Sequence, residues 1–334
     1  MDKNSGKHEE VSFISTFRED EAGVKILLDS LIRQTKLPDE VVLVDGGSPA
    51  STLGVLEEFA SRARQIGIET QILVRPGCNI AEGRNAAIER ASFGVIASSD
   101  AGCILDASWL EEITSPFSRE EVEMVSGTYR PQAASTWERA VAAFLMPDPD
   151  RVAESIPSAR SVAFRKSVWE AVGGFPEILN HGEDTYFSLR AKQLGVRTVF
   201  TSRALVRWRP RRDAASFFKQ ILLYSIGDAT VGISIGYYVK KMTLFVAGLL
   251  MLALSPSHPH FFLILLALLG ATLWLLYRRV PGEFKDPGVI LLLLPVCVIH
   301  LTAQSTGFII GSLKRALSAK GPPPPGRRFR AGQR

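Results

Sequence analysis

The sequence lacks the phosphate-binding motifs of the most common nucleotide-binding enzymes. No GxGxxG follows the first expected strand, residues 11–16, and no P-loop lysine is present, which excludes dinucleotide-binding and P-loop proteins. The three cysteines show neither CxxC nor Cys/His spacing, so we expect no structural zinc and a reducing compartment. Because residues 1–10 contain no apolar run, we expect no signal peptide and a front domain that stays in the cytosol.

A strong excess of charge of one sign is also missing. The net charge is only +5 over 334 residues, and much of the excess lies in the basic, Pro-rich tail at 314–334. The charge therefore indicates local partners and no nucleic-acid partner. The tail either lies against anionic lipid headgroups or is a solvated end.

Long apolar runs, in contrast, dominate a predicted membrane region at 236–313. Three segments almost free of charge occupy 239–256, 260–277 and 288–312. A bilayer is crossed by about 20 apolar residues, so we expect a multi-pass protein of the cell membrane that contacts membrane lipids. Residues 212–227 are expected to form an amphipathic helix at the membrane interface.

Basic residues indicate how the apolar segments are oriented. Lys240 and Lys241 flank the first segment and Arg278 follows the second, whereas the connection between them has no Lys or Arg. The positive-inside rule then places the catalytic domain in the cytosol and pairs the first two segments as a hairpin. Pro295 interrupts the third segment. That segment either crosses once, which would put the basic tail outside, or is re-entrant or broken.

The front of the chain alternates short apolar runs with charged helical patterns. The runs occupy 11–16, 41–45, 70–74 and 94–98. Near-continuous apolar strands separated by helices indicate an α/β domain with a parallel sheet covered on both faces. Thr16, Asp45 and Asp100 stand at the carboxyl ends of such strands, where ligands of these sheets bind. Ser51 is expected to cap the helix after the second strand.

Four motifs of this front part occur in one characteristic order. They read VSFISTFRED, EVVLVDGGSPAST, NIAEGRNAAIERASFGVIASSDAG and GEDTYFSLRAKQLG. Together they resemble family 2 glycosyltransferases of the GT-A fold. The resemblance implies a GT-A glycosyltransferase domain at 1–230, with a mostly parallel, Rossmann-like central sheet, followed by C-terminal transmembrane segments.

The same resemblance implies a nucleotide-sugar site. By match to the family motifs, its residues are Ser15, Thr16, Glu19, Asp45, Arg84, Asn85 and Asp100. The segment with Arg84 and Asn85 lies near the diphosphate in the family, where an alanine stands in place of Gly83. Asp100 would face a divalent cation, Mg²⁺ or Mn²⁺, that is bridged to the diphosphate.

The metal-facing DxD element of the family is incomplete in this chain, because its second acid is Gly102. One carboxylate with diphosphate oxygens and water is still an acceptable Mg²⁺ shell. Asp106 is the alternative second ligand, although its position before a helical pattern favours a helix cap.

Two adjacent acids, Glu183 and Asp184, open the last motif. Acids are common in the first turn of a helix because the helix dipole favours them there. The family resemblance instead implies that Asp184 is the catalytic base, with Glu183 in a secondary role. A carboxylate can accept the proton of an acceptor hydroxyl.

These observations predict a membrane-anchored, inverting and non-processive glycosyltransferase. The donor would be a nucleotide-sugar, and the family resemblance favours a uridine over a guanosine nucleotide. The acceptor would be lipid-linked or otherwise in the membrane. The Gln-x-x-Arg-Trp motif of processive synthases is not continued after Gln220. The alternatives are a processive polysaccharide synthase and a catalytically degenerate membrane scaffold of the same fold.

Overall fold

The computed structural model of the protein describes residues 9–145, 156–280, 282 and 285–317. This part of the chain divides into two compact units. The first contains residues 9–130 and 156–208, and the second contains 131–145 and the described residues from 209 onward. Residues 131–145 and 209–230 therefore pack with the apolar helices, although both ranges fall within the 1–230 domain expected from the sequence.

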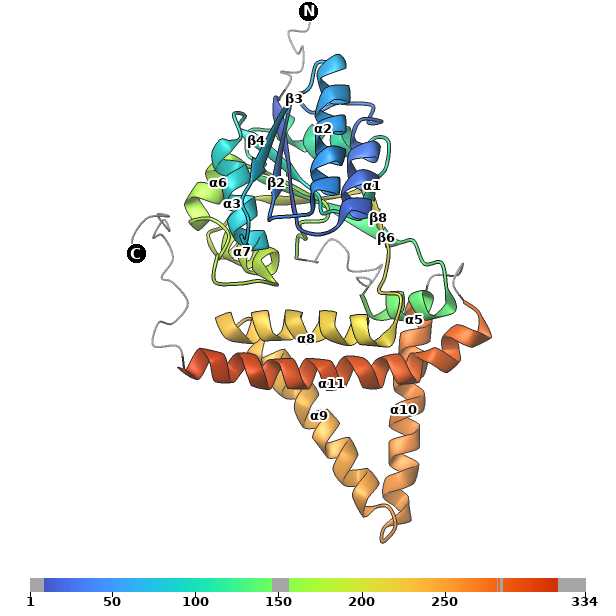
Figure 1. The fold of residues 1–334 in the computed structure, drawn as a ribbon. Coiled ribbons are helices and arrows are strands. Elements are labelled where there is room, and N and C mark those ends of the chain that lie inside the picture. Colours follow the sequence, from blue (N-terminus) through green and yellow to red (C-terminus); the bar gives the residue numbers. More distant parts are fainter. Residues whose placement is uncertain (1–8, 146–155, 281, 283–284, 318–334) are drawn as a thin grey trace, which may run out of the picture. The chain divides into compact units, whose positions relative to one another are not determined.

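A mixed sheet runs through the first unit (Figure 1). The strand order is β3 (Glu69–Val74), β2 (Glu40–Asp45), β1 (Val11–Phe17), β4 (Val95–Ser98), β7 (Val162–Arg165), β6 (Met124–Pro131), β8 (Thr198–Trp208) and β5 (Cys103–Leu105). From β3 to β4 all neighbours are parallel. β7 is antiparallel to β4 and β6, and β5 is antiparallel to β8. The expected parallel sheet is confirmed, and antiparallel strands extend it.

Helices cover both faces of this sheet. They are α1 (Glu21–Leu31), α2 (Ala50–Gln65), α3 (Ile80–Arg90), α4 (Trp109–Thr114), α6 (Lys166–Val172) and α7 (Glu183–Gln193). Every residue of β1, β2 and β4 is buried, which matches their continuous apolar runs. α3, α6 and α7 share one apolar core with Ile14, Val42 and Ile96. α1 and α2 contact each other and lie together in Figure 1.

Two expected helix caps are wrong. Pro49 is the N-cap of α2 and no side chain caps that helix, so Ser51 does not have this role. Ser108 is the N-cap of α4, also without a side-chain bond. The carboxylate of Asp106 is instead paired with Arg207 of β8 at 3.0 Å. At α2 a proline occupies the N-cap. Before α4 the side chain of Asp106 is used in a tertiary ion pair and does not cap the helix.

The second unit is helical. It contains α5 (Thr136–Leu145), α8 (Ala214–Val231), α9 (Ile235–Leu254), α10 (Pro259–Arg279) and α11 (Pro287–Leu317). In the described part of the chain α9, α10 and α11 are long and apolar enough to cross a membrane, and they cover the three expected segments. α11 continues as one helix through Pro295. The tail beyond residue 317 lies outside the described residues.

Two glycines bring α11 against α8. A Cβ atom on Gly307 would lie 2.5 Å from the carbonyl oxygen of Leu222, and one on Gly311 would lie 2.5 Å from that of Ile226. Ala229 of α8 faces the second glycine. Small residues spaced by four let helix backbones approach closely, which is how apolar helices associate without a hydrophobic driving force. The order of these contacts means that α8 and α11 run side by side in the same direction.

We expect Gly307→Ala and Gly311→Ala to lower the thermal unfolding midpoint of the detergent-solubilised protein. Gly270→Ala in α10 is the matched control, because no atom lies within 4 Å of its Cβ position. Alanine stabilises a helix interior by about 1 kcal/mol relative to glycine, so the control should melt at the same temperature or higher. Three equal midpoints would show that α8 and α11 can separate at no cost.

Candidate functional site

The site begins where α3 approaches the carboxyl end of β1. Asn79 caps α3, and its side chain and that of Glu82 form a reciprocal capping box. A Cβ atom on Gly83 would collide with Oγ1 of Thr16. The glycine that stands in place of the family's alanine therefore permits this close approach, and it places the first turn of α3 directly beside Thr16.

The other predicted residues of this edge serve its turns. Asp45 is fully buried, and both of its carboxylate oxygens accept from the N–H of Ser48, at 3.0 and 3.1 Å. Glu19 is exposed, has a positive φ of 57° and donates its N–H to the hydroxyl of Ser48 at 2.9 Å. Ser15 donates to the carbonyl of Ser99 at 2.9 Å and so ties the end of β1 to the end of β4. These contacts give each of the three a structural role.

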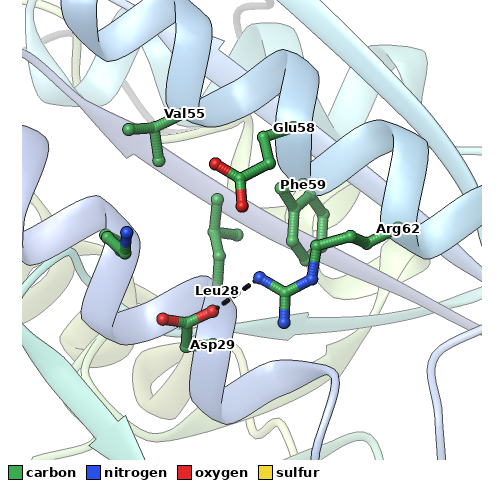
Figure 2. A pocket seen from close by; sticks show the side chains of 7 residues that line it. Leu28, Asp29, Val55, Glu58, Phe59 and Arg62 are labelled. Atoms are coloured by element: carbon green, nitrogen blue, oxygen red, sulfur yellow. Dashed lines mark hydrogen bonds and ion pairs between the residues drawn. The ribbon is translucent and has the colours of Figure 1, made fainter.

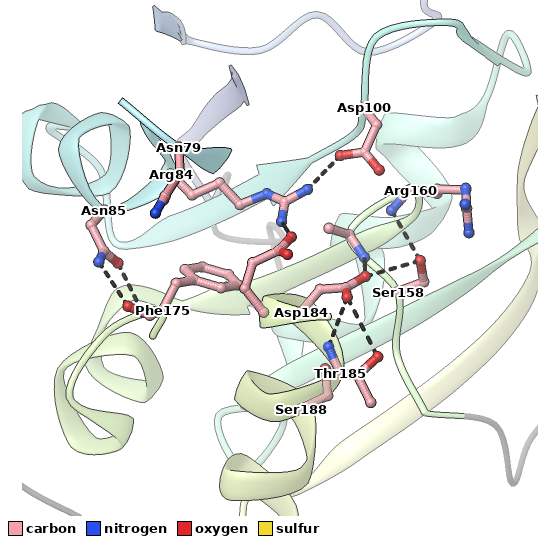
Figure 3. A network of polar contacts seen from close by, with 12 residues as sticks. Asn79, Arg84, Asn85, Asp100, Ser158, Arg160, Phe175, Asp184, Thr185 and Ser188 are labelled. Atoms are coloured by element: carbon pink, nitrogen blue, oxygen red, sulfur yellow. Dashed lines mark hydrogen bonds and ion pairs between the residues drawn. The ribbon is translucent and has the colours of Figure 1, made fainter. Parts of the chain in front are cut away.

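Arg84 lies at the centre of a buried ion-pair network (Figure 3). Its Nη2 donates to Oδ1 of Asp100 at 2.6 Å, and its Nη1 donates to Oε1 of Glu183. Asp100 follows β4, whereas Glu183 is the first residue of α7. The guanidinium carbon lies 5.6 Å from the ring centre of Phe175, and Arg84 is only 2% exposed. The planar fork of arginine suits such a two-carboxylate site.

Burial and charge shift the titration of this network. Burial raises the pKa of Glu183 to about 7, and the nearby charges of Asp184 and Asp100 act in the same direction, so that together they outweigh the guanidinium of Arg84. Burial by itself would lower the pKa of Arg84, but the three carboxylates raise it above its usual value. Arg84 thus stays charged, while Glu183 can exchange a proton near neutral pH.

Asp184 is held in a fixed orientation by four donors, one of which is the hydroxyl of Thr185 at 3.5 Å from Oδ1 (Figure 3). Its Oδ2 accepts from the N–H of Ala159 at 3.1 Å and from the hydroxyl of Ser158 at 3.3 Å. Its Oδ1 accepts from the N–H of Thr185 at 2.8 Å. The side chain is half-buried. The sequence stretch that begins at Ser158 resembles the family's acceptor-side segment, but the contacts of Ser158 and Ala159 with Asp184 were not predicted, because a single serine and a backbone N–H carry no recognisable pattern.

Asn85 holds the chain after α6 in place. Its Nδ2 donates to the carbonyl of Phe175 and to Oε1 of Glu177, both at 2.9 Å. Its Oδ1 accepts from Trp169 Nε1 at 3.0 Å and from the N–H of Phe175 at 2.8 Å. A side-chain amide has two donors and two acceptor positions, so these four bonds use its full capacity. The structure therefore does not bring Asn85 together with Asp100 as a ligand-contacting group.

Asp100 is the carboxylate of this network that is accessible to a cation, with 31% of its side chain exposed. Among the described residues no group of three or more His, Cys, Asp or Glu side chains could hold a metal. Gly102 has a φ of +82°, a left-handed conformation that favours glycine. Mg²⁺ commonly binds through one or two carboxylates with waters and substrate phosphates. The residues present therefore fit a cation that arrives with a diphosphate.

The small cavity between α1 and α2 is too small for a substrate (Figure 2). It includes Leu28 and Phe59 in its lining and has a volume of about 10 Å³, which is room for about one water molecule. At this cavity Arg62 donates to Asp29 at 2.9 Å, and both side chains are partly exposed. This partly exposed ion pair can serve as a control for the buried ion pairs of Arg84.

The sheet, with acids at its carboxyl edge, has a GT-A-like arrangement. Residues 12–165 match the family model of glycosyl transferase family 2. Residues 12–165 therefore match a family 2 glycosyltransferase domain on a GT-A-like sheet, as the sequence motifs predicted.

Two known proteins are similar to this chain. Over 206 residues it is 25% identical to the O-antigen chain rhamnosyltransferase WbaN of Salmonella anatum. This match covers 56% of this chain and 62% of that relative. The chain thus spans less than two thirds of that relative's length. The structure of the mannosyltransferase PcManGT from Pyrobaculum calidifontis, in complex with GDP-Man and Mn²⁺, superposes with a TM-score of 0.55. The two chains share 17% identity over 94% of this chain and 89% of that one, which shows a common fold.

We expect Arg84→Ala to destabilise the first unit far more than Arg62→Ala. Removing one partner of a buried ion pair leaves uncompensated charge and costs about 3–5 kcal/mol, whereas an exposed pair contributes about 0–1 kcal/mol. Thermal unfolding midpoints of the two purified variants check this. Equal midpoints would contradict the assignment of Arg84 as the organising residue of the site.

The pKa of Glu183 predicts a pH dependence of stability. The carboxyl titrates near 4.5 when unfolded and near 7 in the folded protein, so the folded state binds the proton more tightly. Its stabilising contribution is therefore complete below pH 4.5 and is lost as the pH rises to about 7. The unfolding midpoint of the wild type should fall relative to that of Glu183→Gln over this range. A constant difference between the two proteins would contradict the raised pKa.

Proposed function

We propose that the protein is a membrane-bound, inverting and non-processive glycosyltransferase. In this proposal it moves one sugar from a nucleotide-sugar to a lipid-linked or other membrane acceptor. The proposal rests on one observation, the bridge from Asp100 through Arg84 to Glu183. This bridge joins the carboxylate expected at the donor diphosphate to the residue next to the expected base, Asp184.

The proposed reaction is a direct displacement at the anomeric carbon. The acceptor hydroxyl oxygen forms a bond to this carbon on the face opposite the diphosphate, and the bond from the carbon to the diphosphate oxygen breaks. Asp184 takes the hydroxyl proton, and the nucleoside diphosphate leaves with the bonding electrons. Ser158 and Ala159 hold the carboxylate of Asp184 in one orientation, which a general base requires.

Arg84 is a positioning residue in this mechanism. The family resemblance implies that it lies near the diphosphate, but a guanidinium that is 2% exposed and paired with two carboxylates is poorly placed for direct contact. We propose that it acts by fixing Asp100 and by pairing with Glu183. Asp184, which Ser158 and Ala159 hold in place, is the acid of the pair that is positioned to take up the acceptor proton.

A divalent cation completes the proposed donor site, with Asp100 as the protein ligand. When bound, the cation neutralises charge that develops on the leaving diphosphate. The Mn²⁺ named for the mannosyltransferase PcManGT supports this assignment. Because this chain offers few ligands, cation and donor should bind together, with weak cation binding in the absence of nucleotide.

The acceptor is inferred from the second unit and from the rhamnosyltransferase relative. Helices long and apolar enough to cross a membrane would keep the enzyme where a lipid-linked saccharide is found. The relative is named for O-antigen chain synthesis, which supports a role in cell-envelope glycan assembly. A screen of nucleotide-sugars against membranes, with mass spectrometry of the lipid products, tests this and distinguishes one added sugar from a polymer.

We expect Asp184→Asn to lower kcat by about 10²–10⁴-fold, the usual contribution of a general base. Donor affinity should stay unchanged, because the base acts on the acceptor hydroxyl and does not hold the donor. Single-turnover transfer and calorimetric donor binding in Mn²⁺ measure the two effects separately.

Ser158→Ala is the graded control, since it removes one of the donors that orient Asp184 and should cause a smaller loss of kcat. Transfer at the wild-type rate in Asp184→Asn would show that the base lies elsewhere. Absence of donor binding in the wild type, with every nucleotide-sugar tried, would favour the scaffold alternative.

A further inference from the structure

We propose that α11 does not cross the membrane but lies in the plane of its interface, beside α8. The α9–α10 hairpin is then the part of the second unit that spans the bilayer. This inference concerns membrane topology and is independent of the proposed reaction. It follows from the helices that α11 contacts, from the positions of its two ends and from its length.

The helix that α11 packs against along its length is α8. α8 is not among the described helices that are apolar enough to span a membrane. It carries the exposed Lys219 and the half-buried Asp228, and charged side chains within a bilayer are costly. Phe217 of α8 stacks on His300 of α11, with ring centres 6.3 Å apart, and the Gly307 and Gly311 contacts continue along the pair. A helix packed in the same direction along a non-spanning helix shares its plane.

The two ends of α11 contact the end of α10 and the start of α9. Near its start, Val289 and Leu293 share an apolar cluster with Val280, the residue after α10. Near its other end, Phe308 stacks on Tyr238 in the first turn of α9, with ring centres 5.1 Å apart.

The start of α9 and the end of α10 are the two ends of one hairpin, as Figure 1 shows. If the hairpin spans the bilayer, these two ends lie at the same membrane surface. α11 connects them, so it runs along this surface and does not leave it.

The length of α11 agrees with this arrangement. Its 31 residues correspond to about 46 Å at 1.5 Å per residue, against a hydrocarbon core of about 30 Å. Fitting the whole helix into the core would require a tilt beyond the usual limit of about 40°. Its exposed side carries apolar residues along its length, including Leu291 at 78% and Leu313 at 58% exposed. An in-plane helix needs such a face for the lipid.

The distribution of basic residues supports the same topology. If α11 stays at the surface, Lys240, Lys241, Arg278, Lys314 and Arg315 all lie on one side of the membrane, with only the Lys- and Arg-free turn of the hairpin on the other. The conflict between a spanning third segment and the positive-inside rule then disappears. The occupant of the exposed apolar face is the lipid of the leaflet in which α11 lies.

Single cysteines in the full chain test the proposal. Ser257→Cys reports the hairpin turn, Lys285→Cys the start of α11 and Ala316→Cys its end, each in a background without the native cysteines. All three sites are exposed. We expect a membrane-impermeant maleimide to label Lys285→Cys and Ala316→Cys from the same side of oriented membrane vesicles, and Ser257→Cys from the opposite side. Labelling of Ala316→Cys together with Ser257→Cys would overturn the proposal.

Depth measurements give a second readout that does not depend on access. Nitroxides at the exposed positions Leu291, Val298 and Leu313 of α11 should have similar, shallow depths in the bilayer. The matched positions Leu263, Leu268 and Leu275 of α10 are also exposed, and their depths should change steadily along the helix. A clear maximum of depth in the middle of α11 would show that it spans.

Discussion

The buried contact of Arg84 with Asp100 and Glu183 is the constraint on which the catalytic domain depends. Taking a guanidinium and carboxylates out of water is costly, and the cost is met only if the geometry is good and every partner is present. Here the partners come from three elements: α3, the turn after β4 and the start of α7. These elements therefore have to be placed together, and Gly83 permits this by removing the side chain that would hold α3 away from Thr16.

The same contact divides the work of two neighbouring acids. Glu183 points to Arg84 and is buried, whereas Asp184 receives hydrogen bonds from the segment at 158–159. Adjacent residues in the first turn of a helix do not face the same way, so one pairs with Arg84 in the interior while the other is held by the segment at 158–159. Because Arg84 also holds Asp100, one guanidinium links the turn after β4 to the start of α7.

Sequence reasoning was sufficient for the parts of this structure that depend on local pattern. Continuous apolar runs predicted β1 to β4 as parallel strands, of which β1, β2 and β4 are fully buried, and the motifs predicted the acids at the ends of the strands. It failed at two helix starts: Pro49 and not Ser51 is the N-cap of α2, and the side chain of Asp106 pairs with Arg207. The link from Arg84 to Glu183 joins residues 99 positions apart. No periodicity encodes such a link, and the four bonds of Asn85 are equally invisible until α6 is in place.

The second unit shows a different limit of sequence reasoning. Hydropathy measures how apolar a helix is and not the direction in which it runs, so α10 and α11 give similar signals. What separates them is what they contact: α10 exposes apolar side chains along its length, whereas α11 buries a face with two glycines against α8. Glycines spaced by four occur both in spanning and in in-plane helices, and only the identity of the partner distinguishes the two. In the proposed topology the partner is α8, which carries Lys219 and Asp228, and packing along this non-spanning helix is what keeps α11 at the membrane surface.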